Sequence, residues 1–374
     1  MRVVVAPQEF KGSLTARQAA DAIAAGVRDA LPDAQIDVIP MSDGGAGIVD
    51  AMLAARGGEL VTTRVHDPLM RPVDAAWGLL DGGKTAIIEM AAASGLVLLS
   101  EAERDPLVAT TYGTGELVRA ALDRGCRRMI VGVGGSATVD GGAGAMQALG
   151  ARLIDAGGRD LPPGGGPLAQ LVRIDASRRD PRLAEAAIVV ASDVTNMLCG
   201  PAGAAAVFGP QKGASPDGVR QLDEALRHFA AAVGRDLGVD VLDVPGGGAA
   251  GGLAAGLMAI AGATIRPGFD VLAEAVGLEA KIAAADLVIT GEGHLDAQTA
   301  YGKTASGVAR LARAHGKRVG AVAGRVDPAA AAAGAFDAVE ACAPAGMPVD
   351  QAMREAAELA RSATQRVVGA LQRE

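Results

Sequence analysis

The chain has 374 residues, 50% hydrophobic and 21% charged, and this length suits two domains better than one. Its formal net charge of -8 argues against a nucleic-acid or anionic-membrane partner, because either requires a positive surface field. Three widely spaced cysteines, Cys126, Cys199 and Cys342, match no metal-ligand spacing and favour a reducing, cytoplasmic location over a disulfide framework.

The first residues predict a parallel α/β unit. Residues 3–6 form a short apolar stretch that is typical of a strand rather than a signal peptide. A capping-box pattern at Thr15 and apolar residues at helical spacing predict a helix over residues 15–31. A second strand at 36–39 and a loop at 41–45 follow. Ligands of such sheets usually lie beyond the carboxyl ends of the strands.

The pattern changes near His66. Residues 73–80 and 85–90 are strand-like, and Asp81-Gly82-Gly83 between them predicts a hairpin. A Gly-rich middle then extends to about Ala285, with helices predicted over residues 115–123, 217–235 and 252–261. The uncharged residues 245–265 are mostly Gly and Ala, which predicts a buried loop and helix rather than a membrane span.

The opening pattern returns at the end of the chain. We predict a strand at 287–290, a helix at 304–315, a strand at 319–323 and a helix from about Val349. The sequence thus predicts an α/β fold with two domains. Residues 1–66 and 286–374 form a discontinuous parallel-sheet domain, and residues 67–285 form an inserted Gly-rich α/β domain.

Two glycine motifs match nucleotide-binding patterns without the required context. Residues 78–85 satisfy the P-loop pattern, but both flanks are strand-like and the centre predicts a hairpin turn. Residues 246–251 satisfy the dinucleotide G-x-G-x-x-G pattern, with 239–244 as a candidate preceding strand. Asp270 lies near the separation expected of a ribose-binding acid but follows a turn-like stretch. The favoured interpretation is a Gly-rich start that lets a helix pack closely or approach an anion.

The strongest anion-site candidate is the segment 131–142, which follows a strand-like stretch and precedes an Ala/Gly-rich helix. Its glycines let successive amides turn inward, and its hydroxyls add donors without bulk. The residues concerned are Gly134, Gly135, Ser136 and Thr138. The alternative is a tight strand-to-helix turn without a ligand.

Several acids follow predicted strands. Asp193 and Asn196 could position Mg²⁺ or a substrate hydroxyl, and the alternative is an Asx-turn or helix cap. Asp43 has the same two interpretations. Glu292 and Asp296 follow the strand predicted at 287–290.

Cations among small residues are the remaining candidates. Lys11 lies between the first strand and its helix, where it could hold a carboxylate or phosphate. Lys212 and Lys303 are further candidates, although a lone Lys is usually a solvated surface charge. His294 lies in a candidate loop, and a surface or packing role is its more common interpretation.

Taken together, these segments resemble the glycerate kinase family, which includes the bacterial glycerate 2-kinases. The resemblance covers nearly the whole chain and rests on residues 10–14, 40–45, 91–96, 111–117, 132–142, 193–196, 203–214, 246–252, 287–293 and 302–304. It implies a flavodoxin-like domain formed by both chain ends, an inserted second domain, ATP as co-substrate and Mg²⁺. The implied reaction transfers the γ-phosphoryl group to a hydroxyl of D-glycerate, with 2-phosphoglycerate as the favoured product.

The chain departs from the family pattern in four places. Gln8-Glu9 stands where the family typically has Asp-Ser, and Ala46-Gly47-Ile48 stands where it has Glu-Gly-Thr. His294 replaces a usual Arg, and Ser192 replaces a usual Cys. Most of these changes alter polar contacts to a small acid, so another hydroxy acid or sugar acid is the alternative acceptor.

We assign roles on this basis. The phosphate cradle is Gly134, Gly135, Ser136 and Thr138. Asp193 is the metal ligand and a catalytic residue, with Asn196 as a second ligand.

The substrate side has its own candidates. Lys11 holds the substrate carboxylate, and Ser13, Glu292 and His294 are further substrate contacts. Asp43 orients or deprotonates the attacking hydroxyl. Lys303 neutralises charge on the transferred group.

Two rival functions remain. A nicotinamide-dependent oxidoreductase would use residues 246–251, and a catalytically inactive binding protein would explain the altered Gln8, Glu9 and Ala46. The expected partners are ATP and a small hydroxy acid, and a homodimer is a candidate assembly.

Overall fold

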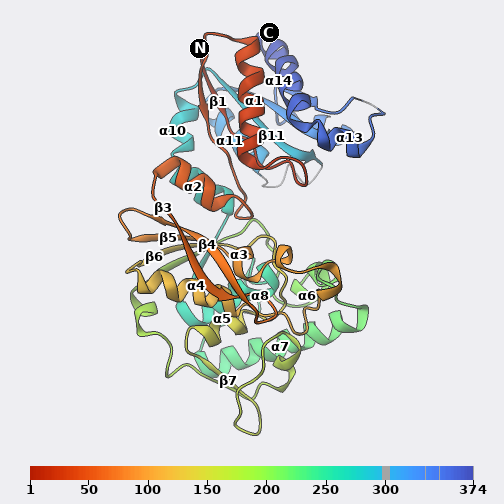
Figure 1. Ribbon diagram of the computed structural model, residues 1–374. Coiled ribbons are helices and arrows are strands. Elements are labelled where there is room, and N and C mark those ends of the chain that lie inside the picture. Colours follow the sequence, from red (N-terminus) through yellow and green to blue (C-terminus); the bar gives the residue numbers. More distant parts are fainter. Residues whose placement is uncertain (297–303, 333, 345, 374) are drawn as a thin grey trace. The chain divides into compact units, whose positions relative to one another are not determined.

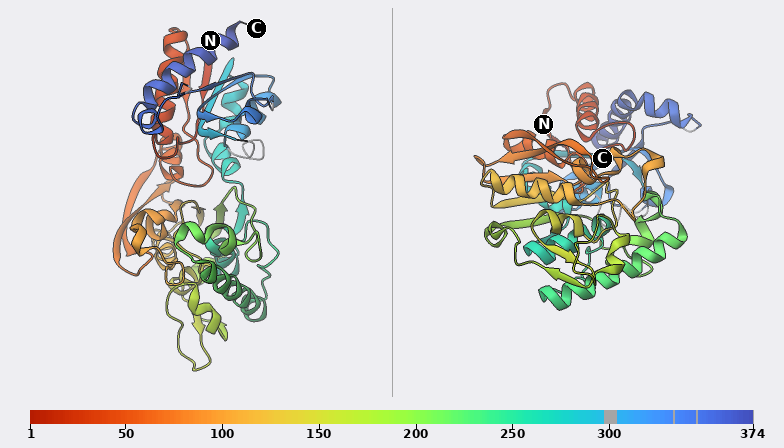
Figure 2. Two further views of the ribbon diagram at one scale, coloured as in Figure 1. Left: turned by 90° about the vertical axis from the view of Figure 1, so that its right-hand side faces the viewer. Right: turned by 60° about the horizontal axis from the view of Figure 1, so that its bottom comes forward.

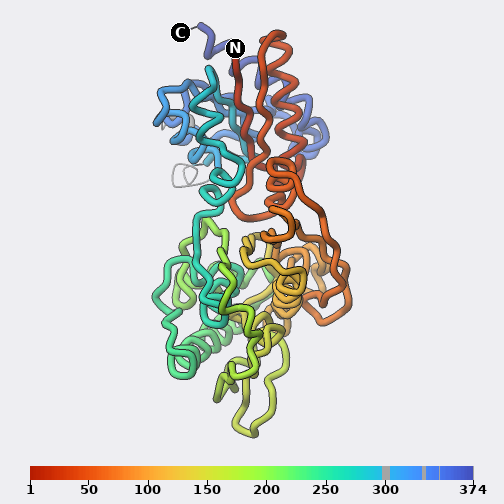
Figure 3. The backbone as a smooth tube through the Cα atoms, turned by 90° about the vertical axis from the view of Figure 1, so that its left-hand side faces the viewer, coloured from red at the N-terminus to blue at the C-terminus, as the bar shows by residue number. Residues whose placement is uncertain are grey.

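The computed structural model describes residues 1–296, 304–332, 334–344 and 346–373 as a mixed α/β chain (Figure 1). The chain divides into two compact units. Unit 1 contains Met1–Asp43, Asp50–Arg56 and Phe269–Glu374, and unit 2 contains Gly44–Val49 and Gly57–Gly268. Figure 3 traces the chain from red in unit 1, through orange and green in unit 2, and back to blue in unit 1.

Unit 1 is built on a parallel sheet. Its strands lie in the order β13 (Ala338–Ala341), β12 (Arg318–Val326), β11 (Leu287–Leu295), β1 (Arg2–Val5) and β2 (Gln35–Val38). Counted along the chain within this unit, that order is 2-1-3-4-5, which is the flavodoxin-like arrangement. The predicted fold class is therefore confirmed.

Helices cover both faces of this sheet. Val322 packs with α1 (Ala16–Ala30) and α14 (Ala356–Gln372), whereas its neighbours Ala321 and Ala323 pack with α11 (Thr304–Ala314). Successive strand residues point to opposite faces, so an apolar run can serve both layers. The other helices are α2 (Ile48–Arg56), α9 (Gly268–Ala275), α10 (Leu278–Ala283), α12 (Pro328–Ala332) and α13 (Val349–Arg354).

Local sequence determines the first helix and its packing. Thr15 accepts a hydrogen bond from the Gln18 amide, and the Gln18 side chain accepts one from the Thr15 amide, so the predicted capping box is confirmed. A Cβ built on Gly26 would lie 2.3 Å from the Arg361 carbonyl oxygen, so glycine permits the close approach of α1 and α14 (Figure 2). The C-terminal helical segment begins at Val349 as predicted, and an interruption at Glu355 divides it into α13 and α14.

Unit 2 contains a mixed sheet. Its strands lie in the order β10 (Thr264–Arg266), β9 (Ala187–Ala191), β6 (Arg128–Gly132), β5 (Thr85–Glu89), β4 (Pro72–Leu80) and β3 (Glu59–His66). The four strands from β10 to β5 are parallel, and β3, β4 and β5 pair antiparallel. The predicted hairpin is confirmed, and residues 78–85 therefore form no P-loop.

The helices of unit 2 pack around one apolar core. They are α3 (Ala91–Ser94), α4 (Tyr112–Asp123), α5 (Ala143–Ala148), α6 (Ala204–Phe208), α7 (Pro216–Leu237) and α8 (Ala249–Ala261). A small ribbon of β7 (Arg152–Ile154) and β8 (Arg173–Asp175) completes the unit. Helix α8 is buried, as predicted for the uncharged segment. Within the described ranges, every helix is too short or too polar to cross a membrane.

Three predictions differ from the structure. Strand β11 extends to Leu295, because residues beyond Thr290 continue to pair with β12, so Glu292 and His294 lie in a strand rather than a loop. Residues 239–244 form no strand. Strand β3 pairs with β4 in unit 2, although the predicted boundary at residue 66 places it in the other domain.

Candidate active site

The carboxyl ends of three parallel strands lie together in unit 2. Glu89 at the end of β5 pairs in register with Gly132 of β6, and Gly132 pairs with Ala191 of β9. The loops that follow β6 and β9 contain the predicted phosphate cradle and the predicted metal ligands. The two loops therefore leave the sheet at the carboxyl ends of neighbouring strands, which is where ligands of open α/β sheets bind.

The loop after β6 forms a tight, buried turn. Gly135 has φ +72, a conformation that favours glycine. A Cβ on Gly134 would lie 2.5 Å from the Cα of Gly45, so a second glycine is required for this close approach. Ser136 is 7% exposed and Thr138 is fully buried. The Ala137 amide donates to the Ser94 carbonyl, which fixes the course of the turn.

A buried lysine side chain donates hydrogen bonds to this turn. The Lys212 Nζ donates to the Ser136 Oγ and to the Thr138 carbonyl oxygen, each at 2.7 Å. Burial lowers the pKa of Lys212 to about 7, and the charge of Asp140 opposes that change. From the sequence alone, Lys212 is only one of several candidate cations. Its partners lie 76 and 74 residues away, so no local pattern could identify them.

Asp140 anchors the end of the same loop. Its carboxylate accepts hydrogen bonds from the Thr111 amide and hydroxyl, both at 2.8 Å, and from the Gly142 and Gly144 amides. Burial raises the pKa of Asp140, and these hydrogen bonds oppose the rise. One carboxylate thus ties the loop to the first turns of α4 and α5. Sequence reasoning gave Asp140 no role of its own.

The glycines at the start of α8 serve packing against this loop. A Cβ on Gly251 would lie 1.9 Å from the Thr138 carbonyl oxygen, and the Gly141 amide donates to the Gly251 carbonyl at 2.9 Å. The described residues directly before 246–251 form no strand, so this segment is not the dinucleotide fingerprint. The favoured interpretation, a Gly-rich start that permits close packing, is confirmed.

Asp193 and Asn196 follow β9. The Asp193 Oδ1 accepts a hydrogen bond from the Gly268 amide at 2.7 Å, and the Asn196 Nδ2 donates to the Ala202 carbonyl at 2.8 Å. The described part of the chain holds no group of three His, Cys, Asp or Glu side chains arranged to bind a metal. Mg²⁺ in phosphoryl-transfer sites is usually held by one or two carboxylates together with phosphates and water. One carboxylate with a neighbouring amide fits that manner of binding.

A segment that departs from the family pattern covers the same strand ends. A Cβ on Gly44 would lie 2.4 Å from the Ala191 carbonyl oxygen. The Glu89 Oε1 accepts hydrogen bonds from the Gly47 amide at 2.9 Å and the Val49 amide at 3.1 Å. Ala46 lies within this segment. Glu89, which sequence reasoning did not single out, is therefore the carboxylate that fixes the loop.

Unit 1 places the substrate-side candidates at the carboxyl end of its own sheet. After β1 the chain forms a tight loop in which the Phe10 and Leu14 backbones pair. Lys11 is exposed on this loop, and the Ser13 Oγ donates to the Phe10 carbonyl at 2.9 Å. The backbone of the loop lies against Gly293 of β11, where a Cβ would be 3.1 Å from the Lys11 nitrogen.

Three charges gather near this loop. Burial and the charge of Asp43 raise the pKa of Glu9, and the charge of Lys11 opposes the rise. Asp43 is the last residue of unit 1 before Gly44. Unit 1 therefore brings Lys11 and Asp43 into electrostatic range of the same neighbour, Glu9, one of the residues that depart from the family pattern.

The remaining substrate-side candidates differ in position. Glu292 is 5% exposed within β11. The His294 Nε2 lies 3.0 Å from the Asp327 Oδ1, an ion pair when the ring is protonated. Lys303 lies outside the described residues.

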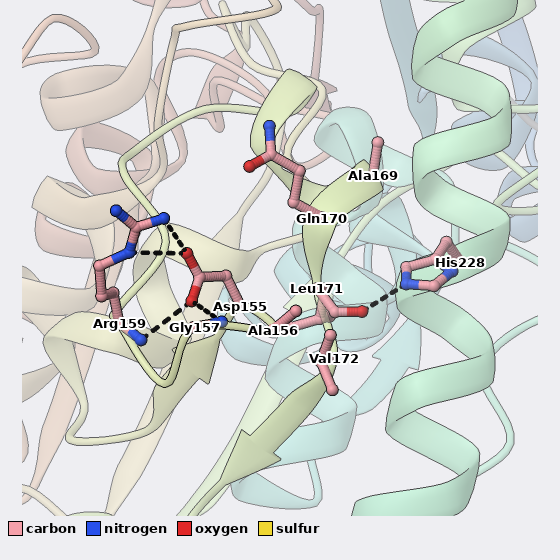
Figure 4. A pocket seen from close by; sticks show the side chains of 9 residues that line it. All are labelled: Asp155, Ala156, Gly157, Arg159, Ala169, Gln170, Leu171, Val172 and His228. Atoms are coloured by element: carbon pink, nitrogen blue, oxygen red, sulfur yellow. Dashed lines mark hydrogen bonds and ion pairs between the residues drawn. The ribbon is translucent and has the colours of Figure 1, made fainter.

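One open cavity lies elsewhere in unit 2. It has a volume of about 410 Å³ and is lined by the turn that begins at Asp155, by residues 169–172 and by His228 (Figure 4). Asp155 pairs with Arg159, and the His228 ring contacts the Leu171 carbonyl. None of the predicted site residues lines this cavity, so we do not assign the chemistry to it.

Comparison with known proteins gives one consistent result. The profile of the glycerate kinase family matches residues 3–372. The chain is 48% identical to the glycerate 2-kinase of Escherichia coli K12 over 87% of this chain and 85% of that protein. It is 45% identical to the glycerate kinase of Bacillus subtilis 168 over 96% of this chain and 94% of that protein.

The fold agrees with a solved structure. A crystal structure from Salmonella typhimurium LT2, presented as a candidate glycerate kinase 2, is 48% identical and superposes with a TM-score of 0.87. The match covers 100% of this chain and 98% of that one. The chain therefore belongs to the glycerate kinase family.

Proposed function

We propose that the chain is an ATP-dependent kinase that phosphorylates D-glycerate, with 2-phosphoglycerate as the product. The observation that carries this proposal is the 48% identity to a glycerate 2-kinase over 87% of the chain. The product assignment follows from the name of that relative. A Gly-rich turn after one of several parallel strands, at their carboxyl ends, supports it physically.

The first part of this proposal concerns the phosphates of ATP. The turn formed by Gly134, Gly135, Ser136 and Thr138 cradles the ATP phosphates through its backbone, because glycines let the main chain approach a ligand closely. Asp193, assisted by Asn196, would hold Mg²⁺. Bound Mg²⁺ would neutralise charge on the phosphate oxygens.

The second part concerns the acceptor. Lys11 holds the glycerate carboxylate, and Ser13, Glu292 and His294 contribute polar contacts. The hydroxyl oxygen bonds to the γ-phosphorus as the bond from that phosphorus to the bridging oxygen of ADP breaks. The hydroxyl proton passes to the Asp43 carboxylate, and ADP leaves. Lys303 would neutralise charge on the transferred group.

A second acceptor class follows from one observation. Glu9 adds a carboxyl group beside Asp43 and Lys11, where the family pattern has a smaller Ser. A carboxyl at this position can accept a hydrogen bond from an additional hydroxyl. A longer hydroxy acid or sugar acid is therefore the alternative substrate. We further propose a cytoplasmic enzyme, with a homodimer as its candidate assembly.

The test is ADP release with Mg-ATP and a panel of acids: D-glycerate, L-glycerate, tartronate and erythronate. Selective turnover of D-glycerate supports the proposal. Turnover of erythronate alone keeps the kinase and assigns the longer acid. No turnover with any acid, together with no ATP binding, contradicts the kinase proposal.

A further inference from the structure

Lys212 is a fully buried ammonium that bonds only to neutral oxygens among the described residues. Its Nζ donates to the Ser136 Oγ and the Thr138 carbonyl, and its side chain is 1% exposed. Transfer of a charged amine from water to a protein interior costs several kcal/mol. A neutral donor would hold the same two oxygens at a lower cost. Holding the shape of the turn therefore does not by itself explain why the buried group at residue 212 is an ammonium.

We propose that Lys212 is a positioning residue for the nucleotide: it holds the Gly134–Thr138 turn and places a buried positive charge beneath the phosphates. This inference rests on the proposed function, which assigns phosphate binding to that turn. An anion on the turn stabilises the ammonium across a medium of low dielectric constant. The Thr138 Oγ1 in the same turn is buried and makes no hydrogen bond within the described residues.

The charges around Lys212 determine how nucleotide binding depends on pH. Asp140 acts on the ammonium from the loop and favours its protonated form, whereas burial disfavours it and gives a pKa of about 7. Arg104 approaches the adjacent Gly213 through its backbone and Cβ. Bound phosphate raises the pKa of Lys212. The protein therefore takes up a proton on binding when the pH lies above the pKa of Lys212 in the nucleotide-free protein. Nucleotide affinity then falls as the pH rises above neutrality.

Binding of Mg-ADP, measured by calorimetry in two buffers of different ionisation enthalpy, tests this inference. We expect the wild type to take up more protons at about pH 8 than at about pH 6, because the free group has lost its proton at the higher pH. Lys212→Met should bind roughly tenfold more weakly near pH 6 and lose this difference in proton uptake. Lys84→Met, which removes an exposed lysine of the same unit, should match the wild type.

The possible outcomes are distinct. Normal folding of Lys212→Met with wild-type affinity and wild-type proton uptake overturns the inference. If that variant does not fold, wild-type uptake that rises with pH supports the inference, and its absence overturns it. ADP release with D-glycerate is measured in parallel. Turnover without linked proton uptake refutes only the role of Lys212, whereas absence of both nucleotide binding and turnover refutes the proposed function as well.

Discussion

The Cα of Gly251 approaches the carbonyl oxygen of Thr138 so closely that a Cβ on Gly251 would lie 1.9 Å from it. That carbonyl also accepts the hydrogen bond from Lys212. The backbone of the proposed phosphate turn is therefore held between a glycine and a buried ammonium. Substitutions of Gly251 and of Lys212 each test this arrangement.

Gly251→Ala should deform the turn. The substituted residue would have to adopt φ +69 and would clash with the Thr138 carbonyl. We expect a loss of about 2 to 4 kcal/mol in the free energy of unfolding and weaker Mg-ADP binding. Gly238→Ala is the control, because Gly238 has the same φ of +69 and no atom near its Cβ position. The control should lose about 1 kcal/mol and bind normally. Equal behaviour of the two variants in urea unfolding and nucleotide titration would contradict this packing argument.

Asp193→Ala should lower kcat by on the order of a hundredfold or more, because an unneutralised phosphate charge costs several kcal/mol in the transition state. The fold should persist, because the hydrogen bond from the Gly268 amide to the Asp193 carboxylate contributes only about 1 to 3 kcal/mol. Asp240→Ala removes an exposed carboxylate that also accepts one backbone amide in unit 2 and should keep wild-type kcat. A Mg²⁺-dependent Asp193→Ala enzyme with wild-type kcat would remove Asp193 from the mechanism.

Asp140→Asn should destabilise unit 2 by about 3 kcal/mol, because in either orientation the amide NH2 group would face a backbone N–H donor and could accept no hydrogen bond from it. One carboxylate oxygen receives the Thr111 amide, the Thr111 hydroxyl and the Gly144 amide, and the other receives the Gly142 amide. Asp123→Asn, at an exposed carboxylate paired with Arg182, should cost at most about 1 kcal/mol. Urea unfolding distinguishes the two variants, and a loss as small in Asp140→Asn as in the control would refute the anchoring role.

Glu9→Gln should change the dependence of stability on pH. Burial and the Asp43 charge raise the pKa of Glu9 above 4.5, so the ionised form is disfavoured in the folded state. Wild-type folding therefore loses stability as the pH rises through the pKa of the folded protein. The variant should be more stable than the wild type at neutral pH, and the difference should shrink as the pH falls below about 4.5. Thermal unfolding across this range, with exposed Glu59→Gln as control, measures the effect. A wild type that gains stability relative to the variant at neutral pH would contradict it.

Features that depend on neighbouring residues could be predicted from the sequence. The Thr15–Gln18 capping box and the hairpin around Asp81 depend on interactions within a few residues, and both have the predicted structure. The length of β11 could not be predicted in the same way. Its glycines resemble a loop, and only pairing with β12 makes Glu292 and His294 part of a strand.

The candidate site shows the same distinction. Its glycines and its position after a strand predict the turn at Gly134, and in the structure this turn follows the end of β6. The support from Lys212 could not be predicted, since it arises from folding over 76 residues of chain. The one available signal was a lysine among small residues within a stretch that resembles the family.

NMR of the reaction mixture tests the transfer of phosphate from ATP to D-glycerate most directly. The sample contains the enzyme, Mg-ATP and D-glycerate, and phosphorus–proton correlation identifies the phosphorylated carbon. We predict equal amounts of ADP and a phosphoglycerate whose phosphate lies on the C2 oxygen. Phosphate on the C3 oxygen would contradict the product assignment. ATP that remains unchanged beside D-glycerate would contradict the transfer itself.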